Sequence, residues 1–190
     1  MKGSSRSAKD SVVFTNQLKR DFRSRIRALQ QEGKLDLNSA VIAMLGAGKD
    51  SMASSSARYF LRLFIRSERI YQDLTLAREQ NTSPGLCIRE WCDIDIGMEF
   101  RTFVHGSSLT AMSQYDYIIV SNDLNNATKR EEIISALQQY WRTLVHPALN
   151  PEGTDRFQSY IVDFAIDCTG KPWVIELNPF EVNTTLISSA

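Results

Sequence analysis

The sequence predicts an α+β fold in which antiparallel sheets pack against helices. Two segments, residues 98–120 and 159–179, have the pattern of β-hairpins, because in each of them apolar runs flank a glycine-containing turn signal. Three other segments, residues 15–32, 54–79 and 128–145, repeat apolar residues at spacings of three and four, which is typical of amphipathic helices. With 190 residues, of which 43% are apolar, the chain is long enough for one domain, or for one domain with an appendage.

The net charge and the cysteine content argue against some classes of protein. The 22 acidic and 22 basic residues give a formal net charge of zero, which argues against a general nucleic-acid-binding protein. The three cysteines, Cys87, Cys92 and Cys168, have no metal-ligand spacing, and an odd number argues against a disulfide framework. We therefore expect a reducing, cytoplasmic setting. No apolar run approaches the ~18 residues of a membrane span, so none is expected.

Residues 1–38 are predicted to form a basic N-terminal tail followed by an amphipathic helix. The helix over residues 15–32 has Thr15 as its expected N-cap and ends at Gly33. Its apolar stripe consists of Phe14, Leu18, Phe22, Ile26 and Leu29, and its basic residues, which lie mostly elsewhere, are Lys19, Arg20, Arg23, Arg25 and Arg27. Such a helix can bind a membrane surface or an acidic partner. The alternative is a docking helix whose basic face is only solvated.

A short buried strand is predicted over residues 40–45, followed by a glycine-rich loop. The loop differs from a Walker phosphate loop, since Gly46 and Gly48 are too close and Asp50 follows Lys49 where Ser or Thr should stand. A flexible loop with one lysine is still able to cover phosphates, which makes Lys49 a candidate nucleotide-binding residue. The alternative is an ordinary turn between a strand and a helix.

The C-terminal hairpin, residues 159–179, collects polar groups on one face. If residues 169–170 form its loop, Asp163 lies opposite Glu176, and Asn178 follows two residues later. The opposite face then carries core residues, namely Tyr160, Val162, Phe164, Ile166, Trp173, Ile175 and Leu177. Like charges directly opposite each other destabilise a sheet, so the two carboxylates and the amide predict a bound cation.

The donor types indicate which cation this is. Oxygen ligands without His or Cys suit a hard cation such as Mg²⁺. Mg²⁺ held by so few protein groups normally takes its remaining ligands from water and phosphate. The hairpin therefore predicts half of a nucleotide-phosphate site, built from Asp163, Glu176 and Asn178. The alternative is that Asp163 is exposed and that Glu176 pairs with a Lys or Arg.

The hairpin over residues 98–120 also collects polar groups on one face. With a Gly106–Ser107 loop, the expected pairs on that face are Arg101 with Met112 and Glu99 with Gln114, and Asp116 shares it. The expected core face carries Met98, Phe100, Val104, Ala111 and Tyr115. An isolated surface pair such as Glu99 with Arg101 is worth little, so the alternative is a purely structural hairpin.

Three motifs have a distinctive order and spacing. They are Cys87-Ile-Arg-Glu-Trp-Cys-Asp with Gly97-Met-Glu-Phe-Arg-Thr-Phe-Val, then Ala111-Met-Ser-Gln-Tyr-Asp-Tyr, and then Val162-Asp-Phe-Ala-Ile-Asp with Gly170-Lys-Pro-Trp-Val-Ile-Glu-Leu-Asn-Pro-Phe. Taken together they resemble the cell-division-cycle protein 123 family. The resemblance is specific over residues 86–120 and 157–187 and vague over residues 40–60, and the first 38 residues do not share it.

The resemblance implies an ATP-grasp-like fold with a nucleotide cleft between two α+β halves. The small half would be residues 39–85 and the large half residues 86–190, after the N-terminal region 1–38. Family members bind ATP and Mg²⁺ and act as assembly chaperones that join subunits of translation initiation factor two. The resemblance therefore implies a protein partner, such as a translation initiation factor subunit, in addition to the nucleotide.

By position, the resemblance also assigns roles to the candidate site residues. Asp163, Glu176 and Asn178 would hold Mg²⁺ and, through it, the triphosphate. Residues 87–91, with Arg89, Glu90 and Trp91, would form the hinge that meets the adenine, Glu99 and Arg101 would lie near ribose and phosphate, and Asp116 would line the cleft. Arginine suits this place because its planar fork donates two hydrogen bonds at once.

Several positions depart from the family pattern. Glu176 stands where the family usually has Asp, and Tyr115 stands where it has Arg. Glu181 follows Phe180 directly, without the usual Gly between them. No basic residue lies within residues 41–43, where one is expected to meet the phosphates, and the lysine of the glycine-rich loop is the candidate substitute. Family members also extend further, so a shortened, divergent member is expected.

We therefore expect a Mg-ATP-binding assembly factor that acts through protein–protein contact. One alternative is an ATP-dependent ligase or phosphoryl-transfer enzyme, for which no catalytic residues are identified. The small number of Lys and Arg residues in the matching segments counts against it, because such chemistry neutralises the triphosphate with cationic groups. A second alternative is a degenerate fold that binds no nucleotide and serves as an interaction module.

Overall fold

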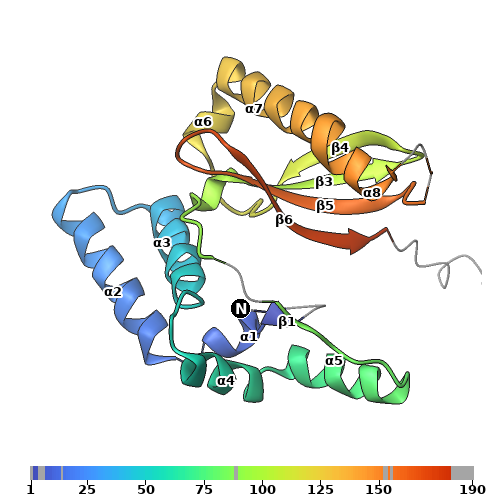
Figure 1. Ribbon diagram of the computed structural model, residues 1–190. Helices are drawn as coiled ribbons and strands as arrows, with labels where there is room; N and C mark the ends of the chain where they lie inside the picture. The colour runs from blue at the N-terminus through green and yellow to red at the C-terminus, as the bar shows by residue number, and fades with distance from the viewer. Residues whose placement is uncertain are drawn as a thin grey trace, which may run out of the picture. The chain divides into compact units, whose positions relative to one another are not determined.

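The structure, a computed structural model, describes residues 2–3, 7–13, 15–87, 90–151, 154 and 156–180 (Figure 1). The chain divides into two compact units, Met1–Cys92 and Asp93–Ala190, and each is described by itself. The domain boundaries expected from the sequence, after residues 38 and 85, remain predictions. No helix in the described ranges is long and apolar enough to cross a lipid bilayer.

The first unit is mainly helical. Its elements are α1 (Lys9–Val12), α2 (Asn16–Gln31), α3 (Leu37–Asp50), α4 (Ala57–Ile65), α5 (Glu68–Glu79) and two short antiparallel strands, β1 (Lys2–Gly3) and β2 (Leu86–Cys87). Hydroxyl side chains cap several helices: Thr15 Oγ1 accepts from Leu18 N at 3.2 Å, as predicted, and Ser67 caps α5. The helices enclose a small core of Ala8, Val12, Phe60, Leu63 and Ile70.

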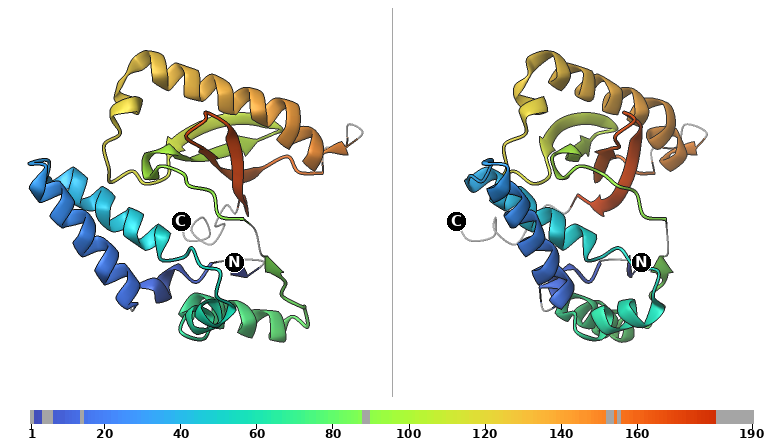
Figure 2. Two further views of the ribbon diagram at one scale, coloured as in Figure 1. Left: turned by 60° about the vertical axis from the view of Figure 1, so that its left-hand side comes forward. Right: turned by 90° about the vertical axis from the view of Figure 1, so that its left-hand side faces the viewer.

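Helix α3 shows that the strand and loop predicted around residues 40–49 are wrong. A capping box starts the helix earlier, because Asp36 Oδ1 accepts from Ser39 N at 2.7 Å and Ser39 Oγ accepts from Asp36 N at 2.8 Å. A short apolar run fits a strand or a buried helix, and this cap favours the helix. Helices α2 and α3 lie side by side (Figure 2), and a Cβ on Gly46 would approach the Arg25 side chain to 3.2 Å. The glycines therefore serve helix packing, and Lys49 lies in the last turn of α3.

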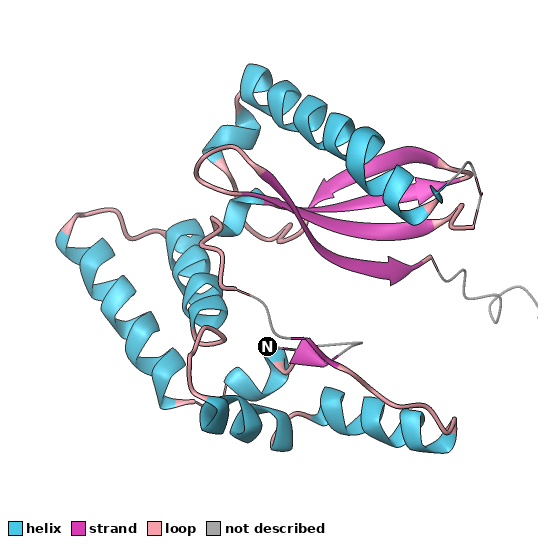
Figure 3. Cartoon of the chain, in the orientation of Figure 1, coloured by secondary structure: helices cyan, strands magenta, loops and turns pink. Residues whose placement is uncertain are grey.

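The second unit contains a four-stranded antiparallel sheet with the strand order β4-β3-β5-β6 (Figure 3). Its strands are β3 (Glu99–His105), β4 (Ser108–Gln114), β5 (Tyr160–Ile166) and β6 (Pro172–Pro179). Its helical segments are η1 (Ile96–Met98), α6 (Asn122–Asn125), α7 (Ala127–Tyr140), the π-helical η2 (Trp141–Val145) and α8 (His146–Leu149). The predicted α+β class, with antiparallel sheets and packed helices, is confirmed.

Helix α7 and η2 cover one face of this sheet and form the core of the second unit with it (Figure 1). The buried core residues are Phe100, Val104, Leu137, Trp141, Val145, Tyr160, Val162, Phe164 and Ile166. Trp141 Nε1 donates to the Tyr160 hydroxyl at 2.8 Å. Burial raises the pKa of Tyr160, and the hydrogen bond from Trp141 partly opposes this shift.

The β3–β4 hairpin has the predicted Gly106–Ser107 loop but a different register beyond it. A bulge between Phe103 and Val104 shifts the pairing by one residue. The observed pairs are Arg101 with Ser113 and Phe100 with Gln114, so the predicted pairs, Arg101 with Met112 and Glu99 with Gln114, are wrong by one residue. The shift also corrects the predicted core face: Ala111 is exposed, and the Tyr115 ring lies against the Arg101 guanidinium.

The β5–β6 hairpin pairs Asp163 with Glu176, which confirms the predicted pairing. Its turn is wider than the predicted two-residue loop, because the Asp167 carboxylate organises it. The donors to this carboxylate are Thr169 N at 2.9 Å, Thr169 Oγ1 at 2.6 Å, Lys171 N at 3.0 Å and Trp173 Nε1 at 2.8 Å. Trp173 consequently pairs with Ala165 and is 37% exposed, so its predicted place in the core is wrong. A bulge next to Asp163 restores the expected pairing further along.

Candidate functional site

Three charged side chains lie in register across the sheet of the second unit. Arg101 on β3 pairs with Asp163 on β5, and Asp163 pairs with Glu176 on β6. Side chains alternate between the two faces of a strand, and the neighbours Phe100 and Val162 belong to the core under α7. The three charged residues, which we call the charged row, therefore lie on the sheet face that α7 does not cover.

Arg101 binds the Asp163 carboxylate through two parallel hydrogen bonds. Arg101 Nε donates to Oδ1 at 2.8 Å, and Arg101 Nη2 donates to Oδ2 at 2.8 Å. The Asp163 side chain is 4% exposed and that of Arg101 is 37% exposed. Bidentate arginine–carboxylate pairs are among the strongest hydrogen-bonded pairs in proteins. Asp163 is therefore not exposed, in contrast to the alternative interpretation of the sequence. The cation beside the carboxylates is the Arg101 guanidinium.

Asn178 and Glu176 complete the surroundings of Asp163. Asn178 Nδ2 donates to Asp163 Oδ2 at 3.3 Å, so the carboxylate receives three donors. The hydrogen bonds to Asp163 are the main cause of a raised pKa for Arg101, and the negative charges of Asp163 and Glu176 add to it. The three residues predicted to bind the metal are therefore gathered on one part of the sheet, together with Arg101.

Tyr115 lies against Arg101 and is tied to Glu99. The Arg101 guanidinium carbon lies 4.9 Å from the centre of the Tyr115 ring, a cation–π distance. Tyr115 N donates to the carbonyl oxygen of Glu99 at 2.8 Å, which ties this residue to the start of β3. Tyr115, expected from the sequence to point into the core, is instead a neighbour of the charged row.

The chemistry of the donor set suits a hard cation, since it offers two carboxylates and one amide. Among the residues that the structure describes, no group of three or more His, Cys, Asp and Glu is placed to hold a metal ion. Both oxygens of Asp163 accept hydrogen bonds from Arg101. Mg²⁺ at Asp163 would therefore fit only after the guanidinium had moved away from at least one of these oxygens.

The remaining predicted site residues are spread over both units. Asp116 is half-buried, and its carbonyl oxygen accepts from Ile119 N at 3.3 Å in the turn after β4. Lys49, Glu90 and Trp91 belong to the first unit, and the latter two are exposed. Arg89 lies outside the described residues. A common site for these residues and the charged row remains a prediction.

Comparison with known proteins identifies the family of this chain. A family model described as D123 matches residues 13–187. This chain belongs to the D123 family. The match begins at residue 13, so the expectation that the first 38 residues do not share the resemblance is wrong for residues 13–38. It includes all of α2, whose sequence lacks the distinctive motifs found later in the chain.

The similar proteins of this D123-family chain include proteins named translation initiation factor eIF2 assembly protein. That of Xenopus laevis is 28% identical over 163 residues, which cover 81% of this chain and 46% of the relative. That of Danio rerio is 29% identical over 147 residues, which cover 72% of this chain and 40% of the relative. The chain thus matches less than half of the length of either relative.

A solved structure supports the same fold. The structure of Cdc123 from Schizosaccharomyces pombe aligns with a TM-score of 0.61 at 20% sequence identity, covering 97% of this chain and 62% of that protein. At this identity the likeness concerns the fold alone. The alignment nevertheless covers nearly all of the D123-family chain, so the similarity of fold is not confined to the best-matching motifs.

Proposed function

We propose that this chain is an assembly factor that contacts a protein partner, a subunit of the translation initiation factor eIF2, and binds MgATP at the charged row. The names of the relatives support the partner. The gathering of Arg101, Asp163, Asn178 and Glu176 on one sheet face supports the nucleotide site.

The observation that carries the nucleotide site is the pair of Arg101 with the buried Asp163. Removing charges from water is costly, so a buried ion pair is weak support for stability by itself. The Asp163 side chain is nevertheless 4% exposed and sits between a cation on one strand and a carboxylate on the next. Glu176 and Asn178 beside this pair add oxygen donors of the kind that Mg²⁺ prefers.

Each residue of the site has a chemical task in this proposal. Asp163 and Glu176, with the Asn178 carbonyl, would hold Mg²⁺, which neutralises triphosphate charge when bound. The planar fork of Arg101 fits two phosphate oxygens as well as it fits two carboxylate oxygens. Arg101 would therefore exchange the Asp163 carboxylate for phosphate when the nucleotide binds. Tyr115 would keep the guanidinium on this side of the sheet.

Calorimetric titration with MgATP tests the nucleotide site. We expect the wild-type chain to bind, and Asp163→Asn and Glu176→Gln each to weaken binding by about tenfold or more, equivalent to at least ~1.4 kcal/mol. Asp123→Asn is the matched control, because it also neutralises a paired carboxylate, which lies 2.7 Å from Lys129 outside the charged row. Far-ultraviolet circular dichroism checks that every variant is folded. A wild-type chain that binds no MgATP would refute the site.

Binding to purified eIF2 subunits tests the partner. We expect one subunit to be retained by the immobilised chain and ADP release to stay near background, as for an assembly factor. Rapid ADP release in the presence of a subunit would instead favour the ligase or phosphoryl-transfer alternative. If no subunit is retained with or without MgATP, the partner part of the proposal fails.

One observation favours a second candidate, an interaction module that binds no nucleotide. The Asp163 carboxylate has three hydrogen-bond donors within the protein, so its charge is compensated without a metal. In this case the charged row would hold β3 and β5 together and nothing more. Retention of an eIF2 subunit by a chain that shows no heat of MgATP binding would select this candidate.

A further inference from the structure

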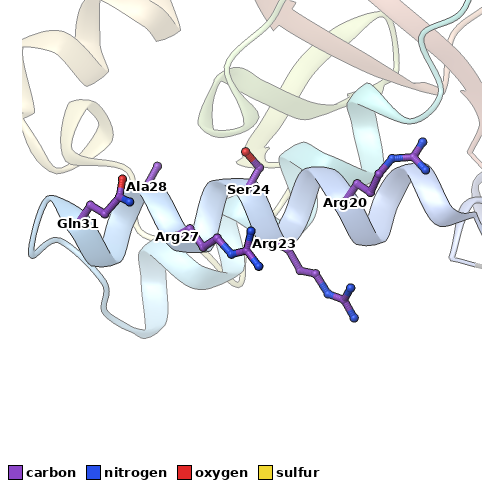
Figure 4. Close-up of a pocket in the computed structure, with 6 residues that line it drawn as sticks. All are labelled: Arg20, Arg23, Ser24, Arg27, Ala28 and Gln31. Atoms are coloured by element: carbon purple, nitrogen blue, oxygen red, sulfur yellow. The ribbon is translucent and has the colours of Figure 1, made fainter.

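Helix α2 carries a groove on its outer surface that the charged row does not explain. The groove has a volume of about 350 Å³ and is lined by Arg20, Arg23, Ser24, Arg27, Ala28 and Gln31 (Figure 4). These residues follow one another at spacings of three and one along a single helix, so they form one continuous stripe. We call this surface the α2 groove.

The stripe that packs inside the first unit is a different one. The apolar residues Leu18, Phe22, Ile26 and Leu29 are half-buried, whereas all six residues of the α2 groove are exposed. Leu18 Cδ1 lies 3.9 Å from the place where a Cβ on Gly48 of α3 would stand. The contacts of α2 with α3 therefore leave the α2 groove on the outside of this helix pair.

The charges of the groove are largely uncompensated. Arg23 and Arg27 make no hydrogen bond or ion pair with any described residue, and Arg20 Nη2 donates only to Gln17 Oε1, at 2.7 Å. Arg25, on another side of the helix, is paired with Asp50. The lining of the groove contains no carboxylate. Three guanidinium groups thus lie along about two turns of helix, and none of them is paired with a carboxylate of the described part of the chain.

One edge of the groove is made of small side chains. Ser24 and Ala28 are four residues apart and lie along this edge, whereas Arg23 and Arg27 point to the other side of the stripe (Figure 4). Gln31 offers an amide at the end of the groove. Small residues at this spacing let another backbone come close, as in the ridge-and-groove packing of helices. The arginines would then reach carboxylates on the neighbouring side of that backbone.

We infer that the α2 groove is the docking surface for an acidic segment of a protein partner. Its carboxylates pair with Arg20, Arg23 and Arg27, and its backbone lies over Ser24 and Ala28. A membrane surface fits less well, because none of the large exposed apolar side chains of the described residues belongs to α2. A nucleic acid fits less well, because the chain has no excess of basic residues. The groove lies wholly in the first unit, so this inference does not depend on nucleotide binding at the charged row.

Fluorescence anisotropy with a labelled peptide of alternating glutamate and alanine tests the inference. We expect the full chain to bind it, and Arg23→Gln with Arg27→Gln to weaken binding by about tenfold, since two exposed pairs are lost. Arg58→Gln with Arg62→Gln is the matched control, because it removes two exposed arginines of α4 and should change the dissociation constant little. Equal losses in the two double variants would show a general charge effect and overturn the inference.

A second pair of variants tests the position of the segment. Ala28→Glu places a carboxylate in the groove, and Gln139→Glu places one at an exposed position of another helix, α7. We expect only the first to weaken peptide binding, and added salt to weaken it further. Equal affinity in the two variants, or tighter binding of a single-stranded oligonucleotide or of phosphatidylserine vesicles than of the peptide, would overturn the acidic protein segment as the occupant.

Discussion

Arg101 and Asp163 hold the two central strands of the second unit together through two hydrogen bonds of 2.8 Å, although 62 residues separate them in the sequence. The pair couples the hairpin β3–β4 to the hairpin β5–β6, because β3 and β5 are neighbours in the sheet. Arg101 also neutralises the Asp163 carboxylate, which would otherwise repel the Glu176 carboxylate opposite it on β6.

The first prediction concerns the cost of breaking this pair. Arg101→Met leaves the buried Asp163 without its cation, and such a loss costs about 3–5 kcal/mol when both partners are buried. Because the Arg101 side chain is 37% exposed, we expect a smaller decrease in the free energy of unfolding, about 2 kcal/mol. Denaturant titration measures it.

The double variant Arg101→Met with Asp163→Leu is the companion test. It removes both charges, so we expect it to recover most of the lost stability, since an apolar pair avoids the desolvation cost. Lys129→Ala breaks the exposed pair with Asp123 and should cost less than about 1 kcal/mol. An Arg101 variant as stable as this control would mean that Asp163 is not held by the arginine.

The second prediction concerns pH and the turn at Asp167. Hydrogen bonds from Thr169 and from Trp173 Nε1 are the main causes of a strongly lowered pKa for Asp167. A carboxyl group with a lowered folded pKa contributes stability above its unfolded pKa, about 3.9, and this contribution is lost as pH falls through the folded value. We therefore expect Asp167→Asn to be less stable than wild type at neutral pH and the difference to shrink below about pH 4.

Urea unfolding at several pH values, followed by circular dichroism, measures this difference. Asp123→Asn again serves as the control, because its carboxylate is exposed and lies in α6 rather than in the turn. A difference between Asp167→Asn and wild type that stays constant from neutral to acid pH would contradict the role of the ionised carboxylate.

The third prediction concerns the polar bond inside the core. Trp141 Nε1 donates to the Tyr160 hydroxyl at 2.8 Å where α7–η2 meets β5. Tyr160→Phe leaves the indole N–H buried without a partner, which costs about 1–3 kcal/mol. Trp141→Phe also removes ring volume, so we expect a larger loss. A double-mutant cycle isolates the bond itself, and a coupling energy near zero would show that the bond does not contribute to stability.

Local patterns sufficed for the parts of the fold that local chemistry decides. The cap at Thr15 and the helix that includes α7 follow from residue spacing and cap chemistry. The pairing of Asp163 with Glu176 was predicted from a two-residue turn, and it occurs because the bulge next to Asp163 offsets the wider turn. The predicted strand over residues 40–45 was wrong because a short apolar run fits both elements, and the deciding cap lies upstream at Asp36.

The rest depended on interactions that residue spacing does not reveal. The bulge beside Phe103 moved Tyr115 from the expected core face to the side of Arg101, and turn length alone gives no sign of it. Residue spacing also does not reveal that the Asp167 carboxylate widens the turn between β5 and β6. The pairing of β3 with β5 is non-local, so residue spacing predicts a cation beside Asp163 without revealing that the Arg101 guanidinium supplies one.

The fourth prediction separates charge from geometry in the proposed nucleotide site. Arg101→Lys keeps the positive charge beside Asp163 but replaces the planar fork with a single ammonium group, which cannot bind two oxygens side by side. If Arg101 exchanges Asp163 for phosphate, this variant should bind MgATP about tenfold more weakly than wild type, a change of ~1.4 kcal/mol, while it retains more stability than Arg101→Met. Calorimetry and denaturant titration on the same preparations give both numbers. MgATP affinity equal to that of wild type would place the triphosphate away from Arg101, and the guanidinium would then serve the sheet alone.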